Sequence, residues 1–345
     1  MNNRIKGIGC LLLVFLLLVG CQSPNNQKTE PVQRTQFVLG TVITVALYDN
    51  GSEELLDRIF DRLLEIENLM SANLDASEIG QINLLSGQEE VVVSDETLEV
   101  IEKGLYYGQL SKGAFDITME PIVKLWNIGT EEASVPNEDV LKFKLSKVGY
   151  QKVVVDTSRR SVFLPEEGMG LDLGGIAKGY AADEIVKLLE VEGVSKAMLN
   201  LGGNVYAMGK KSVDQKWKIG IQNPFDERNE YFGVVAISDH SVVTSGPYER
   251  YFEEDGKRYH HIFDTTTGWP IENEIASVSV VAKSSVDGDA LSTTFFALGV
   301  EEGLLLAESL EGVECIFVDI NKNVSLTSGL KGNFDLTDTA YRFAD

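Results

Sequence analysis

The sequence predicts an α+β (mixed α/β) fold, with antiparallel or mixed sheets flanked by helices. Many short runs rich in β-branched and aromatic residues are interspersed with amphipathic segments of helical periodicity. The two kinds of segment do not alternate in the regular rhythm of a parallel sheet, and no internal repeat is visible. With 43% hydrophobic residues, the chain can bury a substantial core.

The first elements follow from local patterns. Residues 37–48 form an apolar run with Gly40 in its middle, which predicts one strand with a bulge or a close approach. Residues 53–70 carry apolar side chains at helical spacing, and Ser52 can cap this helix. A second helix is expected at about residues 94–111, where a Ser-Asp pair begins the pattern.

The remaining elements are mostly short strands. Residues 153–155 and 161–164 predict a hairpin. Five further apolar runs predict strands, at residues 197–201, 205–208, 217–221, 232–237 and 277–282. A helix near residues 287–298, another helix and a strand around residues 315–319 complete the expected order.

Residues 171–183 (LDLGGIAKGYAAD) predict the end of a short strand, a two-glycine turn and a helix over about residues 176–190. Gly174 and Gly175 let the backbone lie close to another molecule, and the start of the helix offers free N–H groups and a positive dipole. An anion is the natural occupant, while a tight turn with Lys178 in solvent is the structural alternative. The spacing matches neither a P-loop nor a GxGxxG motif.

The N-terminus predicts export and a lipid anchor. Two basic residues precede an apolar run at residues 8–19, and the segment that ends at Cys21 resembles a bacterial lipobox. We therefore expect a signal peptide over residues 1–20, lipid modification of Cys21, a flexible tether over residues 21–35 and a single domain over residues 36–345. This places the protein at the cell membrane, facing the extracytoplasmic side.

Charge and cysteine content limit the possible partners and metal sites. The chain has 30 Lys and Arg against 53 Asp and Glu, a formal net charge of −23, which argues against nucleic acid as a partner. An acidic chain is compatible with a cation-dependent site. After Cys21, only Cys315 remains, so the mature body can form neither an intramolecular disulfide nor a cysteine zinc site.

Asp289 and Thr293 are the candidate metal ligands. They lie four residues apart in a helical stretch, so their side chains share one face. Carboxylate and hydroxyl oxygens suit Mg²⁺ or Ca²⁺. An aspartate near a helix start is more often a cap and a threonine more often packing, so the spacing alone leaves both interpretations open.

Candidate acid–base and ligand-binding groups occur elsewhere. His260 and His261 point to opposite faces if they lie in a strand, and one of them, near Asp264, could act as general base toward a hydroxyl. A structural or surface histidine is the alternative. Asp116 and Asp172 lie beside glycine-rich openings and could bind a base or ribose, although structural capping is the default for either one.

A series of motifs runs in order from residue 37 to about residue 300: Leu39-Gly40-Thr41, Met70-Ser71, Ser77-Glu78-Ile79, Gly113-Ala114-Phe115-Asp116-Ile117-Thr118 with Pro121 and Trp126, Asp172-Leu173-Gly174-Gly175-Ile176-Ala177-Lys178-Gly179, Leu201-Gly202-Gly203, Ser245-Gly246, His261-Ile262-Phe263-Asp264 with Thr267-Gly268 and Pro270, and Asp289-Ala290-Leu291-Ser292-Thr293. Together they resemble the ApbE family of FAD:protein FMN transferases. The resemblance implies a single ApbE-like domain that transfers FMN from FAD to a Thr or Ser hydroxyl of an acceptor, a membrane or exported redox flavoprotein, and releases AMP.

The resemblance also assigns residues. It implies that Mg²⁺, with Mn²⁺ or Ca²⁺ as alternatives, is coordinated by Asp289, Thr293 and the backbone carbonyl of Gly175. It implies that His261 deprotonates the acceptor hydroxyl. The residues expected to contact FAD are Leu39, Asn73, Ala114, Phe115, Asp116, Asp172, Lys178 and Phe263.

The sequence departs from the family pattern at two places. Residues 264–268 read Asp-Thr-Thr-Thr-Gly where the family has Asp-Pro-x-Thr-Gly, and Asn73 stands where many members carry tyrosine. Members with a smaller polar residue at that position can hydrolyse FAD to FMN and AMP. A metal-dependent FAD pyrophosphatase and a non-catalytic flavin-binding lipoprotein therefore remain the alternatives.

Overall fold

The computed structural model describes residues 30–226 and 230–344. The expected signal peptide and Cys21 lie outside the described residues. Strand β1 (Val32–Val38) begins inside the range expected to be a tether, because its residues pair with β2 (Thr41–Leu47) from the first position onward. Regular structure therefore starts a few residues earlier than the sequence predicted.

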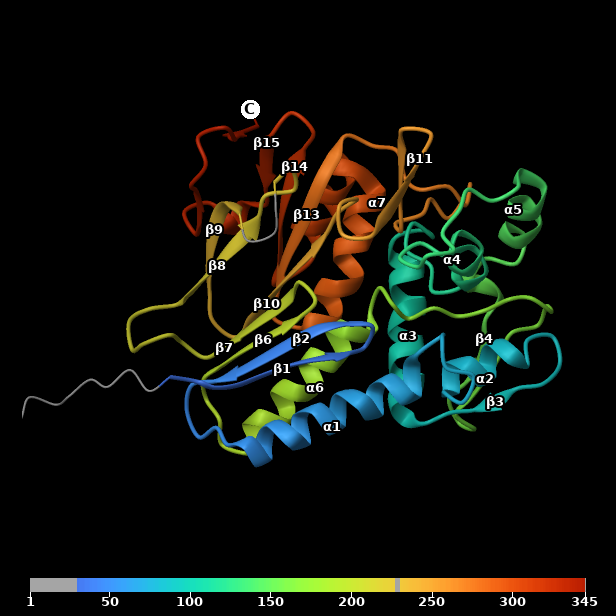
Figure 1. Cartoon of the computed structure of the whole chain (residues 1–345), viewed down its shortest axis with the longest axis horizontal. Helices are drawn as coiled ribbons and strands as arrows, with labels where there is room; N and C mark the ends of the chain where they lie inside the picture. The colour runs from blue at the N-terminus through green and yellow to red at the C-terminus, as the bar shows by residue number, and fades with distance from the viewer. Residues whose placement is uncertain (1–29, 227–229, 345) are drawn as a thin grey trace, which may run out of the picture. The chain divides into compact units, whose positions relative to one another are not determined.

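A nine-stranded sheet organises the domain (Figure 1). Its order is β1-β2-β6-β7-β10-β13-β14-β15-β17, and every pair is antiparallel except β15 with β17. The strands after β2 are β6 (Ala197–Leu201), β7 (Asn204–Met208), β10 (His240–Ser245), β13 (Ile275–Ala282), β14 (Val313–Asp319), β15 (Asn323–Leu326) and β17 (Arg342–Phe343). The predicted mixed α+β fold is confirmed.

Three helices cover one face of this sheet: α1 (Glu53–Met70), α6 (Ala177–Val191) and α7 (Ser285–Ser309). A smaller sheet of β8 (Trp217–Gln222), β9 (Tyr231–Ile237) and β16 (Phe334–Leu336) shares a second apolar core with the other face. All eight residues of β13 are buried, because α7 lies on one side of this strand and the second core on the other.

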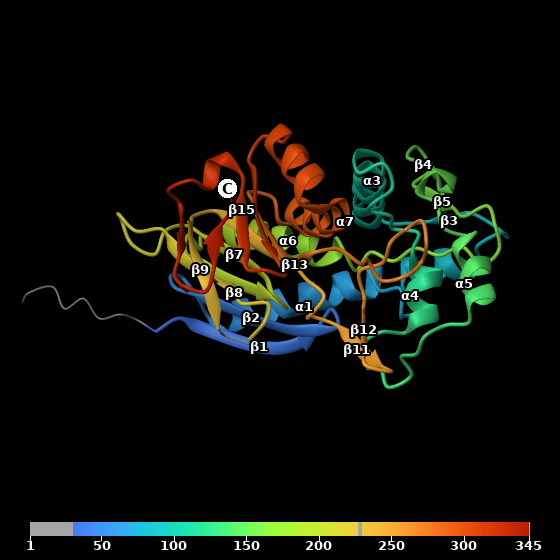
Figure 2. The same ribbon diagram turned by 90° about the horizontal axis from the view of Figure 1, so that it is seen from above.

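The segment between α1 and α6 forms the other end of the domain. Figures 1 and 2 both show α3, α4 and α5 gathered there, with β8 and β9 at the opposite end. Its elements are α2 (Glu78–Leu84), β3 (Val91–Val92), α3 (Asp95–Leu110), α4 (Glu120–Trp126), α5 (Glu138–Leu145), the 3-10 turn Tyr150–Lys152, β4 (Val154–Asp156) and β5 (Ser161–Phe163). The hairpin of β11 (Tyr251–Glu254) and β12 (Lys257–His260) adds Phe252 and Tyr259 to an aromatic cluster around Trp126.

Two strand predictions were wrong. Residues 37–48 form two strands of a hairpin, because Leu39 (φ 54°) and Gly40 (φ 66°) both adopt the left-handed conformation of a type I′ turn. Residues 171–173, expected to end a strand, belong to no regular element. Their backbone instead joins other loops, as when the Asp172 N–H donates to the Ile117 carbonyl (2.8 Å).

Helix α7 spans the region where the sequence predicted two helices. Gly299 interrupts it with φ 86° and ψ 173°, so two helical segments follow one another within a single assigned element. By its length and composition alone, this helix could cross a membrane. Its packing against β10, β13 and β14 and its internal break identify it as the core helix of the domain.

Candidate active site

Several of the predicted motifs meet at one end of the large sheet. The turn at Leu39 and Gly40 lies at the same strand ends as the Gly202 turn between β6 and β7. The two turns are in close contact, because a Cβ on Gly202 would lie 2.2 Å from Thr41 Oγ1. Ser245 closes β10 at this end of the sheet.

Helix α7 brings its first half to this end of the sheet. Ser245 Oγ lies 2.8 Å from Ser292 Oγ, and Ser285 Oγ donates to Asn204 Oδ1 (2.8 Å) at the start of β7. Asp289 lies between these two contacts along the helix. Strand ends and helix therefore enclose the region where Asp289 is placed.

The first turn of α6 packs directly against α7. A Cβ on Gly179 would lie 2.4 Å from the Ser285 carbonyl oxygen, so only glycine permits this approach. The backbone N–H of Gly179 donates to Asp289 Oδ2 (2.8 Å), and Lys178 Nζ lies 3.8 Å from the same oxygen. Asp289 is 5% exposed. Its buried carboxylate is thus held by two groups at the start of α6.

Gly175 and Thr293 complete this arrangement. A Cβ on Gly175 would lie 3.8 Å from Thr293 Oγ1 and 3.2 Å from the Phe115 ring. The Thr293 hydroxyl makes no hydrogen bond to any other described residue. The structure therefore brings together the residues predicted to bind the cation: Gly175, Asp289 and Thr293.

These residues fit a magnesium ion better than a transition metal. Within residues 30–226 and 230–344, no group of three or more His, Cys, Asp and Glu side chains could hold a metal. One carboxylate, one hydroxyl and one backbone carbonyl are hard oxygen donors, and Mg²⁺ is commonly held by one or two carboxylates together with substrate phosphates. These three oxygen donors suit a cation whose remaining coordination positions are filled by the phosphates of a substrate.

The start of α6 faces the carboxylate of Asp289, whereas the sequence predicted an anion of another molecule there. Lys178 Nζ also donates to the Gly174 carbonyl (2.9 Å), so it is not free in solvent. Asp172 Oδ1 accepts the Gly174 N–H (2.7 Å), which supports the capping interpretation of Asp172. The glycine turn is therefore braced from both sides by charged side chains.

Asp116 braces a neighbouring loop. Its Oδ1 accepts the Thr118 N–H (2.7 Å) and hydroxyl (2.6 Å), and its Oδ2 accepts the Tyr150 N–H (2.8 Å). Burial raises the pKa of Asp116, while these hydrogen bonds oppose that rise. The same loop is tied to the segment after His261, because Thr265 Oγ1 donates to the Gly113 carbonyl (2.6 Å). Both contacts fix the backbone on either side of Ala114.

His261 has the geometry of a neutral base. Its Nδ1 lies 3.2 Å from the Arg250 carbonyl oxygen, which can only accept, so Nδ1 carries the proton and Nε2 keeps its lone pair. Burial and the positive charges of Arg250 and Lys178 lower the pKa of His261 to about 3. The influence of Lys178 links His261 to the start of α6. His260 instead places Nε2 2.9 Å from the Ile271 carbonyl and is a structural residue.

Asp264, expected near the candidate base, bonds within its own turn. Asp264 Oδ1 accepts the Thr266 N–H (2.7 Å) and hydroxyl (2.6 Å), so it organises its own turn. Phe263 is 9% exposed and packs 5.9 Å from the Trp126 ring, between centroids. The aromatic cluster therefore sets the position of the segment that carries His261.

Asn73 is the most open of the predicted FAD contacts, and Leu39 lies at the turn of the β1–β2 hairpin. Asn73 is exposed just after the end of α1, and its backbone N–H donates to Ser71 Oγ (3.3 Å). Its side chain forms no hydrogen bond to another described residue. Leu39 is half-buried in its hairpin turn.

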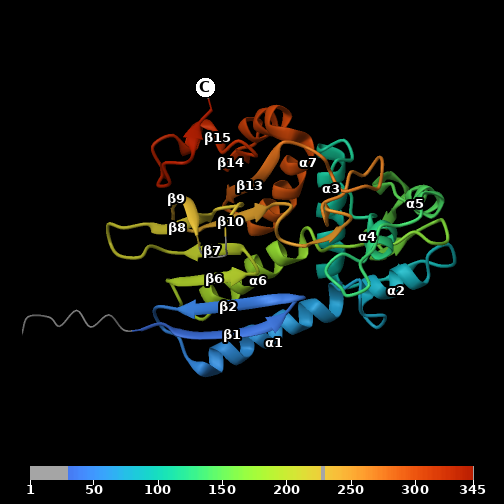
Figure 3. The same ribbon diagram turned by 45° about the horizontal axis from the view of Figure 1, so that its top comes forward.

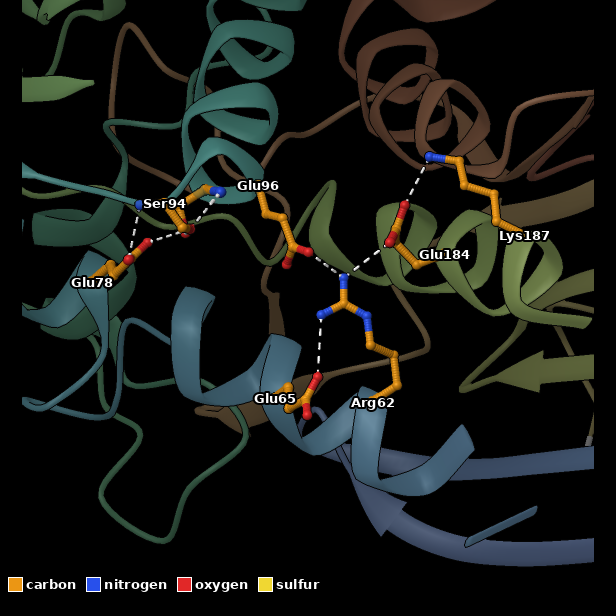
Figure 4. A network of polar contacts seen from close by, with 8 residues as sticks. Arg62, Glu65, Glu78, Ser94, Glu96, Glu184 and Lys187 are labelled. Atoms are coloured by element: carbon orange, nitrogen blue, oxygen red, sulfur yellow. Dashed lines mark hydrogen bonds and ion pairs between the residues drawn. The ribbon is translucent and has the colours of Figure 1, made fainter. Parts of the chain in front are cut away.

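Sequence reasoning missed the residues that hold α6 in place. Arg62 of α1 bonds through Nη2 to Glu96 of α3 (2.7 Å) and Glu184 of α6 (2.9 Å), and Figure 4 shows this arginine between the three helices. Asp183 accepts the N–H groups of Ser285 (2.8 Å) and Val286 (3.0 Å) at the start of α7. Their partners lie far away in the sequence, so no local pattern could reveal them.

The fold and the site define a class that solved structures share. The ApbE protein of Thermotoga maritima superposes with a TM-score of 0.81 at 28% identity, over 90% of this chain and 100% of that one. The flavin transferase ApbE from Vibrio cholerae superposes with a TM-score of 0.79 at 27% identity, over 88% and 99%. The chain thus has the architecture of flavin transferases.

Sequence comparison then gives the family. The ApbE family model matches residues 39–317, so this chain belongs to the ApbE family. The FAD:protein FMN transferase of Klebsiella pneumoniae (strain 342) is 39% identical over 308 residues, 89% of this chain and 95% of the relative. That of Treponema pallidum (strain Nichols) is 35% identical over 351 residues, 97% and 96%.

Proposed function

We propose that this protein transfers FMN from FAD to a Thr or Ser hydroxyl of an acceptor protein and releases AMP. The observation that carries the proposal is that Gly175 in the turn before α6 and Lys178 of α6 converge with Asp289 and Thr293 of α7 at one end of the sheet. This constellation occurs in a chain whose relatives are named FAD:protein FMN transferases. The proposed reaction uses each of these groups.

The chemistry is a phosphoryl transfer. The acceptor oxygen forms a bond to the phosphorus of the FMN half, the bond from that phosphorus to the bridging oxygen breaks, and AMP leaves with that oxygen. The hydroxyl proton passes to Nε2 of His261, which is neutral because the pKa of His261 is lowered to about 3. Negative phosphates beside the ring would raise this pKa and make the base stronger. Lys178 stabilises charge on the phosphates.

Asp289, Thr293 and the Gly175 carbonyl would hold the divalent cation. Mg²⁺ supplies positive charge that neutralises the pyrophosphate when bound. Asp289 is already oriented by the Gly179 N–H and by Lys178, so little side-chain ordering is needed to present its carboxylate. Mn²⁺ and Ca²⁺ are the alternative ions for the same oxygen donors.

Further residues would bind the flavin nucleotide. Phe115 lies beside Gly175, and the loops that carry Asp116 and Asp172 are joined by the hydrogen bond from the Asp172 N–H to the Ile117 carbonyl. The proposed FAD contacts on these and neighbouring loops are Leu39, Asn73, Ala114, Phe115, Asp116, Asp172, Lys178 and Phe263. The internal hydrogen bonds of Asp116 and Asp172 support a role in shaping the binding loops.

The proposed setting is the outer face of the cell membrane. The apolar run before Cys21 and the polar segment after it support lipid attachment at Cys21. The acceptor would then be a membrane or exported redox flavoprotein. Mass spectrometry of the membrane-extracted protein tests the anchor, since it should detect a diacylglycerol-type adduct on Cys21 and an N-terminus at that residue.

Incubation with FAD, Mg²⁺ and co-expressed exported flavoproteins tests the activity. An acceptor should gain the mass of one FMN on a Thr or Ser, and AMP should appear in equal amount. The Lys178→Met and Asp289→Asn variants should lose most of this transfer. If no acceptor gains FMN under any divalent cation, the proposal fails.

A metal-dependent FAD pyrophosphatase is the second candidate, and the exposed Asn73 favours it. Without an aromatic side chain at this position, water can approach where the acceptor hydroxyl would act. AMP release that is as fast without acceptor as with it would establish hydrolysis. A flavin-binding lipoprotein without activity is the better description if neither product forms and Asp289→Ala still binds FAD.

A further inference from the structure

The β1 edge of the large sheet is open and ends at the candidate site. In the part of the chain that the structure describes, no strand lies beyond β1 in the strand order. Figure 3 shows β1 as the outermost strand of the sheet, joined to β2 by the turn that contains Leu39. The opposite edge strand, β17, has two residues, whereas β1 has seven. The longer edge is thus the one that leads to the site.

The hairpin register shows which backbone groups are unpaired. A two-residue turn makes its flanking pair, Val38 and Thr41, a hydrogen-bonded pair, and such pairs alternate along the strands. Phe37 with Val42 is therefore a non-hydrogen-bonded pair. The N–H and C=O groups of Gln33, Thr35 and Phe37 consequently point away from β2 toward the open edge. Their spacing of two residues matches that of an added antiparallel or parallel strand.

This edge has few of the features that usually protect edge strands. Natural sheets block such edges with proline, lysine, inward-pointing charges or bulges. Residues 32–38 contain no proline or lysine, and the hairpin register is continuous without a bulge. The single charge in β1, Arg34, turns to the helix-covered face, where it pairs with Glu53 (2.9 Å) and Asp57 (2.6 Å) of α1.

The uncovered face of the hairpin is apolar next to the turn. Phe37 is 71% exposed and Val42 is 57% exposed, and they are cross-strand partners on the face opposite to α1. Residues 31–48 contain no Asp or Glu, although the chain has 53 of them. The hairpin is therefore a charge-poor, partly apolar surface on an acidic protein, which suits contact with another polypeptide.

We propose that the acceptor protein docks by adding an extended segment to β1, with an apolar side chain against Phe37 and Val42. A segment paired along β1 would advance about 3.3 Å per residue and pass the turn at Leu39 within a few residues. This would bring its Thr or Ser past the turn at Leu39, to the same end of the sheet as the Gly202 turn and Ser245. The inference rests on the proposed transferase function.

Thr35→Pro tests the docking edge. Proline removes the outward N–H of Thr35 without touching the ladder to β2, and edge strands tolerate it. Thr35→Val is the matched control, because both variants lose the hydroxyl that contacts Thr44 Oγ1 (2.9 Å) while valine keeps the N–H. In the proposed mode, KM for the flavinylated acceptor rises about fivefold in Thr35→Pro, as expected for one lost hydrogen bond, and does not rise in Thr35→Val.

Phe37→Ser tests the apolar contact, with Val191→Ser as its control because Val191 is 82% exposed at the end of α6. Phe37→Ser should raise KM for the acceptor about tenfold or more. In all four variants, the melting temperature, FAD affinity and acceptor-independent AMP release should match wild type. A second measurement, hydrogen exchange of the full chain, should show protection of the Thr35 and Phe37 amides when the acceptor is present.

The outcomes separate the two proposals. If the wild-type protein flavinylates no acceptor, the transferase function itself is overturned. If transfer is normal and its KM is unchanged in Thr35→Pro and Phe37→Ser, only the docking edge is overturned. Amides of Thr35 and Phe37 that are already protected in the protein alone would show that a second copy or the N-terminal segment covers this edge, which also overturns acceptor docking there.

Discussion

Asp289 connects two roles that the sequence left as alternatives. Its Oδ2 accepts the Gly179 N–H at the start of α6, which is a capping interaction made across two helices. Its neighbour one turn later, Thr293, has a hydroxyl without a partner among the described residues. Because one carboxylate oxygen of Asp289 caps α6, the carboxylate is fixed in place. Its other oxygen and the Thr293 hydroxyl can then bind a cation.

Two adjacent threonines allow this assignment to be tested. Thr293→Val removes a proposed ligand without changing side-chain shape, and should raise the Mg²⁺ concentration for half-maximal transfer about tenfold or more. Thr294 Oγ1 donates to the Ala290 carbonyl (2.8 Å), so Thr294→Val should lower stability by about 1 kcal/mol and leave the Mg²⁺ requirement unchanged. Magnesium titrations and thermal melts distinguish them. Equal Mg²⁺ curves for both variants would remove Thr293 from the site.

The environment of His261 predicts a pH dependence of stability. The ordinary pKa of histidine is about 6.5, and burial and Arg250 lower that of His261 to about 3 in the folded protein. Between these values the unfolded chain binds a proton that the folded protein does not, so the free energy of unfolding falls as pH drops from 6.5 toward 3. His261→Gln should lose less stability in this window.

Urea unfolding at pH 7 and pH 5 measures this difference. The two proteins should differ in how much their free energy of unfolding changes between these pH values, and the wild-type protein should change more. An identical pH dependence would mean that His261 keeps its ordinary pKa in the folded protein and is protonated at pH 5, which would contradict the lowered pKa.

At the scale of elements, α6 is held in place by contacts with three other helices, α1, α3 and α7. It contacts α7 through Gly179, and Arg62 ties it to α1 and α3. Arg62 is 20% exposed, and its partner Glu184 is 17% exposed. One guanidinium therefore joins two carboxylates from different helices, with Lys187 as a second cation beside Glu184, and opposes the repulsion between the two carboxylates in this partly buried place.

Arg62→Met should destabilise the protein by about 2 kcal/mol or more, because it leaves the partly buried Glu96 without a cation and Glu184 with Lys187 alone. Arg58→Met is the control one turn earlier on α1, since Arg58 pairs with Glu192 at the surface and such pairs contribute little. Urea unfolding should show a large shift for Arg62→Met alone. Similar shifts in the two variants would argue that general helix effects, not the network, are responsible.

Local patterns were sufficient for elements whose signals lie within the element. Ser52 and Ser94 cap α1 and α3 as their sequences predict, because the cap and the apolar periodicity lie side by side. The turn at Leu39 was missed because leucine in a left-handed conformation carries no turn signal. The short helices α4 and α5 were also not predicted.

The sequence predicted which residues gather at the candidate site, but not the hydrogen bonds that join them. The i, i+4 spacing of Asp289 and Thr293 survives in α7, and the family resemblance supplied Gly175 and Lys178. The bonds from Asp289 to Gly179 and from Asp183 to Ser285 join residues about a hundred positions apart, and periodicity contains no information about such pairs. Asp264 is near His261 in sequence, yet its side chain bonds to Thr266 in its own turn.

At the scale of the whole molecule, the net charge of −23 opposes an anionic substrate. Long-range repulsion between the protein and the FAD pyrophosphate is screened by salt, whose Debye length falls from about 30 Å at 0.01 M to about 8 Å at 0.15 M. The dissociation constant of FAD should therefore fall severalfold over this range at fixed, saturating Mg²⁺. Riboflavin, which lacks phosphates, should show no such change in fluorescence titrations. Weaker FAD binding with added salt would show that local attraction at Lys178 dominates.

The hairpin turn at Leu39 has a consequence for evolution and engineering of this domain. A leucine with φ 54° is held in a conformation that costs roughly 1 kcal/mol compared with glycine. Leu39→Gly would therefore relax the turn and make the hairpin easier to form, yet it would delete the side chain that borders the flavin in the proposed site. A search for heat-resistant variants would select this change readily, and an activity screen would reject it. At position 39, selection for stability would therefore favour glycine, whereas selection for activity would favour leucine.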